Sequence, residues 1–83
     1  MNISIEYCME WNYQPKAFSL RDSLNAEFGV LAEMTPSSGG VFEVDVNDTN
    51  LFSKKQSGVF PDDPMYVGPT GGWQYMIKLI REM

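Results

Sequence analysis

The order of the first three sequence patterns constrains the fold more than any other feature of this chain. Residues 2–8 alternate between apolar and polar side chains, which is typical of a strand with one buried face. A helix pattern follows, and residues 30–34 can form a second short strand. A helix that follows one strand and leads to a second, parallel strand forms a right-handed crossover within a sheet. We therefore expect the two strands to lie in one sheet.

The helix pattern is an apolar stripe with spacings of three and four residues. Asn12 to Pro15 is predicted to be a turn, and Pro15 suits the first helical turn. Gly29 is expected to end the helix in a left-handed conformation. The stripe consists of Ala17, Leu20, Leu24 and Phe28.

The middle of the chain predicts a hairpin. Thr35 to Gly40 has the composition of a turn or loop, and Val41–Val46 is the clearest strand, with Glu43 and Asp45 on its solvated face. Asn47 to Asn50 is predicted to be a turn, and Leu51 to Gln56 the second arm. Lys54 and Lys55 on that arm are typical of a solvated or edge-protecting pair.

The remaining patterns complete an α/β architecture. Residues 57–72 contain three prolines and four glycines and predict a long loop. Trp73, Met76, Ile77 and Ile80 then predict a second amphipathic helix. The order β-α-β-β-β-α predicts a thioredoxin-like sandwich of two or three layers with a four-stranded mixed sheet, and residues 1–83 are expected to form a single domain.

Composition limits the chemistry and the partners. A net charge of −5 argues against nucleic acid, and the sequence lacks a signal-peptide pattern and a membrane-spanning run, so we expect no membrane partner and a cytoplasmic location. The single cysteine agrees with a reducing compartment. The absence of histidine removes Cys-His and Ser-His pairs and the commonest metal ligand, so we expect no metal and no cofactor.

Three segments, in order, resemble the selenoprotein W-like group of the Rdx family, which also includes selenoprotein T and H relatives. They are Tyr7-Cys8, the run from Gly39 to Val44, and Ser53-Lys54-Lys55 leading to the run from Gly58 to Pro61. The likeness covers residues 3 to 61 and, through the last helix, most of the chain. It implies a thioredoxin-like fold with a Cys-x-x-Cys or Cys-x-x-selenocysteine pair after the first strand.

The chain departs from that pair at its second position. Cys8 matches the first residue, but Trp11 stands where the second thiol or selenol belongs. Three interpretations of Trp11 stay open. It is a structural replacement, an aromatic that binds a partner, or a selenocysteine position read as tryptophan, since the codons UGA and UGG differ by one base.

With one thiol, Cys8 retains only monothiol chemistry. A mixed disulfide is released internally only when a second, resolving thiol attacks it, and this chain has none. We therefore expect monothiol exchange or glutathionylation, and at most a weak thiol-disulfide oxidoreductase. Protein thiols or glutathione as co-substrate are the expected partners. The position ahead of a helix favours the thiolate and Glu10 opposes it, while Lys16 can offset Glu10. We expect an exposed or semi-exposed thiol; a small buried hydrophobe is the alternative reading.

Four further residues are predicted to bind substrate. Thr35 and Pro36 lie in the loop before the central strand, where thioredoxin-like folds commonly place a cis-proline. An ordinary trans turn is the more common state before proline, and both stay open here. With a cis bond, the backbone can pair with a peptide or glutathione as an added strand. Phe60 and Tyr66 in the long loop are candidates for an apolar rim near Cys8. The same face, with Trp11 and the loop, alternatively makes the chain a non-catalytic protein-interaction module.

Overall fold

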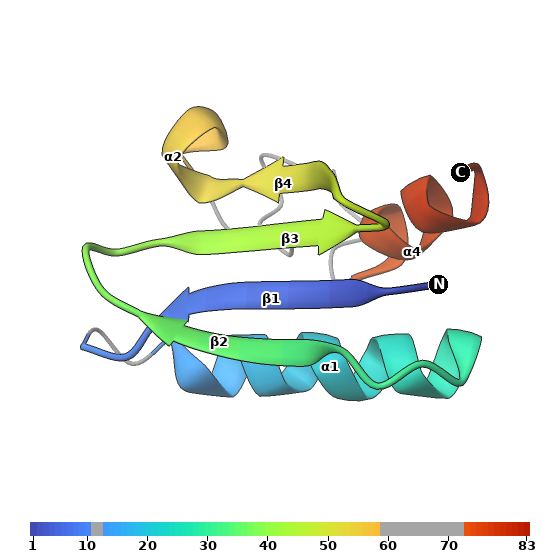
Figure 1. Cartoon of the computed structure of the whole chain (residues 1–83), viewed down its shortest axis with the longest axis horizontal. Helices are drawn as coiled ribbons and strands as arrows, with labels where there is room; N and C mark the ends of the chain where they lie inside the picture. Colours follow the sequence, from blue (N-terminus) through green and yellow to red (C-terminus); the bar gives the residue numbers. More distant parts are fainter. Residues whose placement is uncertain (11–12, 59–72) are drawn as a thin grey trace.

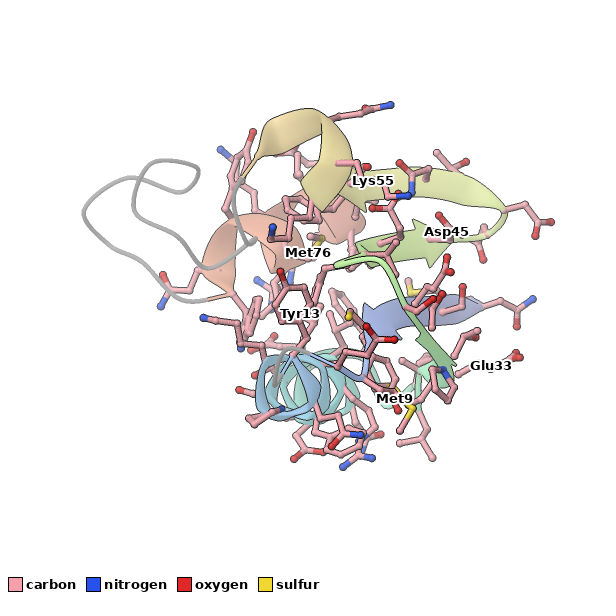
Figure 2. All side chains as sticks on the ribbon, turned by 90° about the vertical axis from the view of Figure 1, so that its left-hand side faces the viewer. Met9, Tyr13, Glu33, Asp45, Lys55 and Met76 are labelled. Atoms are coloured by element: carbon pink, nitrogen blue, oxygen red, sulfur yellow. The ribbon has the colours of Figure 1, made fainter. Side chains whose placement is uncertain are left out.

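The chain folds into one four-stranded sheet with its two longer helices on the same side (Figures 1 and 2). This computed structural model describes residues 1–10, 13–58 and 73–83. None of the described helices is long and apolar enough to span a membrane. The elements, in chain order, are β1 (Ile3–Cys8), α1 (Gln14–Phe28), β2 (Glu33–Ser37), β3 (Phe42–Val46), β4 (Thr49–Ser53), α2 (Lys54–Ser57) and α4 (Gln74–Arg81).

The sheet has the strand order β2-β1-β3-β4. β1 and β2 are parallel, with Ser4 opposite Glu33 and Cys8 opposite Ser37. β3 is antiparallel to both β1 and β4. The predicted thioredoxin-like α/β fold with a mixed four-stranded sheet is therefore confirmed.

One hydrophobic core lies between the sheet and the two helices. It combines β-strand residues with α1 and α4, as Figure 2 shows for Met76, which lies between α4 and the sheet. Alternation puts every second residue of β1 and β3 into this core, beginning with Ile3 and Phe42. The described part of the chain therefore forms two layers. The fully buried side chains in it include Ile5, Leu20, Leu24, Phe42, Val44, Met76 and Ile80.

Two polar contacts join α4 and its N-cap residue Trp73 to α1. The Trp73 Nε1–H group donates a hydrogen bond of 3.1 Å to Ser19 Oγ. Arg81 forms an ion pair with Glu27. These contacts fix the C-terminal helix beside α1, so both helices cover the same sheet face.

The second strand lies three residues later than the sequence predicts. β2 spans Glu33–Ser37, whereas a strand at residues 30–34 and a loop beginning at Thr35 were expected, so that prediction is wrong. Parallel pairing along the whole of β1 determines these bounds, because β2 must reach Cys8. Pro36 is tolerated in the strand because β2 is an edge strand, and an outward-facing N–H is not needed there. The turn is confined to Gly39 and Gly40, both with positive φ.

The hairpin is tighter than predicted. Asn47 and Asp48 have φ of 51° and 68°, as a two-residue type I′ turn requires, so β4 already begins at Thr49. The chain turns into α2 directly after Ser53, which is the last β4 residue that pairs with β3, opposite Glu43. Lys54 and Lys55 thus lie on a short helix, and their predicted place on a strand is wrong. Apart from its first two residues, the long loop predicted for 57–72 lies outside the described residues.

The predicted left-handed cap of α1 is confirmed. Gly29 has φ of 66°, and its N–H donates a hydrogen bond of 2.9 Å to the Asn25 carbonyl oxygen. A Cβ at this position would meet nothing within 4 Å. The requirement for glycine here is therefore conformational and not steric.

We predict that Gly29→Ala lowers the free energy of unfolding by about 1–2 kcal/mol, the cost of a left-handed residue that carries a Cβ. Gly29→Asn should cost less, because asparagine adopts this conformation more readily. Urea denaturation of both variants measures the difference. Equal losses in the two variants would show that backbone conformation is not the cause.

Candidate functional site

Cys8 is the last residue of β1, and backbone hydrogen bonds join this end of the strand to two neighbouring segments. Its N–H donates a hydrogen bond of 2.9 Å to the Val41 carbonyl oxygen. The next N–H, of Met9, donates one of 3.1 Å to the Ser37 carbonyl oxygen. The chain around Cys8 is thus held to the segments that end β2 and precede β3.

The thiol is buried. Cys8 is 0% exposed, so the expectation of an exposed or semi-exposed thiol is wrong. Cys8 nevertheless does not belong to the core cluster that joins the sheet to α1 and α4 in the described chain. Strand alternation places it with Ser4 and Glu6 on the other face of the sheet. It is therefore a buried cysteine outside the main core.

The described residues do not place Cys8 at the helix N-terminus. α1 begins at Gln14, with Tyr13 as N-cap residue and no acidic side chain in the first turn. The predicted second position, Trp11, lies outside the described residues. Part of the segment between Cys8 and the N-terminus of α1, whose dipole was expected to act on the thiol, therefore lies outside the described residues.

Two side chains at this end of the molecule were missed by sequence reasoning. Met9, directly after Cys8, is 50% exposed. Lys54 Nζ lies 5.5 Å from the centre of the Tyr13 ring, a cation–π contact between α2 and the start of α1. In Figure 2, Met9, Tyr13 and Lys55 are labelled at the end that faces the viewer. The lysine placement was missed because the sequence pattern assigned residues 51–56 to a strand.

Of the predicted binding residues, the structure describes Thr35 and Pro36. Both are exposed and lie in β2, where they pair with Glu6 and Tyr7. There is no cis peptide bond in the described chain, so the bond before Pro36 is trans. Thr35 and Pro36 are thus on the edge strand that ends beside Cys8, whereas Phe60 and Tyr66 lie outside the described residues.

The arrangement provides one thiol and no described partner for it. Within residues 1–10, 13–58 and 73–83, no three His, Cys, Asp or Glu side chains are grouped so as to hold a metal ion. Because Cys8 is buried, a reagent can reach its sulfur only if the backbone hydrogen bonds at the end of β1 open. The described chain therefore offers one cysteine sulfur, and this sulfur is buried.

Comparison with known proteins gives a family model, two related sequences and a related crystal structure. The Rdx family model matches residues 2–66. Selenoprotein W of Danio rerio is 35% identical over 66 residues, covering 75% of this chain and 77% of that protein. Migration and invasion enhancer 1 of Mus musculus is 29% identical over 62 residues, covering 74% of this chain but 54% of that protein. The crystal structure of a selenoprotein W-related protein from Vibrio cholerae is similar with a TM-score of 0.69 and 27% identity, covering 81% of this chain and 86% of that one.

Proposed function

The chain is a selenoprotein W-like, redox-related member of the Rdx family, and from this premise we propose that its thiol chemistry is limited to monothiol exchange or glutathionylation at Cys8. The observation that carries the proposal is the single cysteine at the end of β1, with tryptophan three residues later. A dithiol site needs a second sulfur or selenium at that position.

The proposed reaction uses oxidised glutathione as co-reactant. The Cys8 thiol loses its proton to solvent, and the thiolate attacks one sulfur of the glutathione disulfide. The new S–S bond joins Cys8 to one glutathionyl group as the old S–S bond breaks, and the other glutathione leaves as a thiolate that takes up a proton. A second glutathione thiolate can later attack the bound glutathionyl sulfur, which restores Cys8 and returns the disulfide.

Burial adds a condition to this reaction. Because Cys8 is 0% exposed, the attacking thiolate cannot meet a tripeptide disulfide without local opening. The bonds that must open include those from Cys8 to Val41 and from Met9 to Ser37. We therefore expect Cys8 to be glutathionylated more slowly than free cysteine, at a rate that follows the opening equilibrium.

We predict that incubating the folded protein with oxidised glutathione adds one glutathionyl group, detected by intact-protein mass spectrometry and reversed by excess reduced glutathione. Cys8→Ser should show no adduct. Adding urea below the unfolding transition should raise the rate, because it favours local opening. Failure of the native protein to react, while the urea-unfolded protein reacts fully, would refute the monothiol proposal.

The burial of Cys8 also favours a second candidate function, a non-catalytic protein-interaction module of the same fold. A buried thiol that never reacts in the native state has a packing role, and the surface would then carry the function. The same glutathione experiment separates the two functions, since a module has no need of a reactive Cys8.

The third interpretation concerns Trp11. If the position encodes selenocysteine, the natural protein carries a Cys-x-x-selenocysteine pair, and the monothiol limit does not apply. Reading the codon of residue 11 in the native gene tests this directly, since UGG excludes it and UGA supports it.

A further inference from the structure

The second face of the sheet is left uncovered by the described helices. α1 and α4 both pack on the face that carries Ile5 and Val44. The strand residues between these core positions point to the opposite side, and Figure 2 shows Glu33 and Asp45 on the side away from the helices. Cys8, at the end of β1 on this side, is buried, and we call the remaining polar surface the acidic face; its described residues are Ser4, Glu6, Glu33, Thr35, Glu43 and Asp45.

Charge is segregated between the two layers of the molecule. All six lysines and arginines lie on α1, α2 and α4, and none lies on a strand. Arg21 pairs with Asp22 and Arg81 with Glu27, so these two cations are matched by helical carboxylates. The strands that form the acidic face thus carry carboxylates without a basic residue of their own.

The register arranges the carboxylates in two rows across the sheet. One row runs from Glu33 through Ser4 to Asp45, and the next places Glu6 directly opposite Glu43. Side chains directly opposite each other on antiparallel strands have Cβ atoms about 4.5–5.5 Å apart, and like charges there are destabilising. The protein therefore keeps an unfavourable pair at the centre of this face.

Glu43 adds a separate observation. Its Oε2 atom is buried and has no hydrogen-bond donor in the described structure. A buried carboxylate oxygen without a donor loses its hydration and gains nothing in return. A donor from outside the chain, placed between Glu6 and Glu43, would remove this cost once the Glu43 side chain turns its Oε2 atom toward the surface.

A hollow lies at the start of β1, beside the row formed by Glu33, Ser4 and Asp45. It is lined by Ser4, Glu33 and Asp45 of the acidic face, by Asp48 of the hairpin turn, and by Leu31, which is 70% exposed. Carboxylates beside an exposed apolar side chain suit a long cationic side chain, whose stem packs on the apolar surface while its head meets the charge.

We propose that the acidic face docks an arginine-rich segment of a partner protein. Arginine fits better than lysine, because a planar guanidinium with five donors can bridge two neighbouring carboxylates such as Glu6 and Glu43, whereas an ammonium is a point charge. One arginine lies between these two residues and a second enters the hollow beside Glu33 and Asp45. Cys8 follows Glu6 on the same face of β1, but the proposed binding is between charges and does not depend on the reactivity of the thiol.

The test measures the binding of a capped, fluorescent peptide of repeated Arg-Gly-Ser units by anisotropy, at about 50 mM and about 200 mM NaCl, since salt screens such contacts. The double variant Glu6→Gln/Glu43→Gln should weaken binding by about tenfold or more. The control Glu10→Gln/Glu82→Gln removes the same net charge at exposed positions outside the face, and should stay within about twofold of the parent. The matching Lys-Gly-Ser peptide should bind more weakly, and Cys8→Ser should bind like the parent.

A second variant and two further measurements make the outcome decisive. Glu33→Gln/Asp45→Asn should weaken binding independently, which keeps the test valid if the first variant fails to fold. Backbone amide shifts on peptide addition should be confined to β1, β2 and β3. Absence of saturable binding, equal losses in the control variant, shifts confined to the helices, or sedimentation showing that the face instead joins two copies of the chain would each overturn the proposal.

Discussion

Phe42→Ala is expected to leave the chain close to its unfolding transition at room temperature, with the free energy of unfolding lowered by about 3–5 kcal/mol. Phe42 is 0% exposed, and its ring lies edge-on to Phe52 with centroids 6.4 Å apart. Stability of about 0.05–0.15 kcal/mol per residue gives a chain of this length only about 4–12 kcal/mol in total. One cavity under the central strand is therefore comparable to the whole margin.

Urea denaturation followed by circular dichroism measures this loss. Phe18→Ala is the matched control, because it removes the same side chain where it is 37% exposed, with an edge-on contact to Tyr7 and the Arg21 guanidinium over its ring. We expect the control to lose about 1 kcal/mol, mainly from the aromatic contact. Equal losses in the two variants would show that burial in the core between the sheet and the helices does not determine the free energy of unfolding.

The parts of the fold that the sequence predicts correctly are those governed by local periodicity. β3 alternates strictly because one face packs against the helices, and Ala17, Leu20 and Leu24 are buried in α1 as their spacing predicts. The end of α1 follows from a single residue, Gly29. In each case the burial of one face is already present in the order of the side chains.

The errors arise where pairing between distant segments overrides local composition. Thr35-Pro36-Ser37 has the composition of a turn, yet pairing with β1 holds it as an edge strand. Lys54 and Lys55 continue an apparent strand, yet pairing with β3 ends at Ser53 and one helical turn forms instead. Neither outcome can be derived from the residues of the segment alone.

The same limit applies to the candidate site. Cys8 was identified from its position at a strand end, but its burial appears only in the folded chain, where it and Met9 are hydrogen-bonded to the distant residues Val41 and Ser37. The acidic face is a similar case. Alternation already assigns Glu43 and Asp45 to the polar side of a strand, but only the position of both helices shows which side of the sheet is uncovered.

Trp11→Cys is expected to change the product formed at Cys8 from a mixed disulfide to an internal one. A second thiol three residues after Cys8 can attack the glutathionylated sulfur, release glutathione and leave a disulfide between Cys8 and the introduced cysteine. The glutathionyl adduct should then be nearly absent at equilibrium, and reduction of a small disulfide with external thiol as electron source should turn over about tenfold or more faster than in the parent. Mass spectrometry and a turnover assay measure the two effects.

The controls separate a resolving thiol from easier access. Trp11→Phe keeps an aromatic ring without sulfur, so it should retain the stable glutathionyl adduct of the parent. Cys8→Ser in the Trp11→Cys background should abolish the internal disulfide, since one thiol remains. A Trp11→Cys protein that still accumulates the mixed disulfide would mean that the fold does not bring the two positions together, and the missing second thiol would then not be what limits this chain to monothiol chemistry.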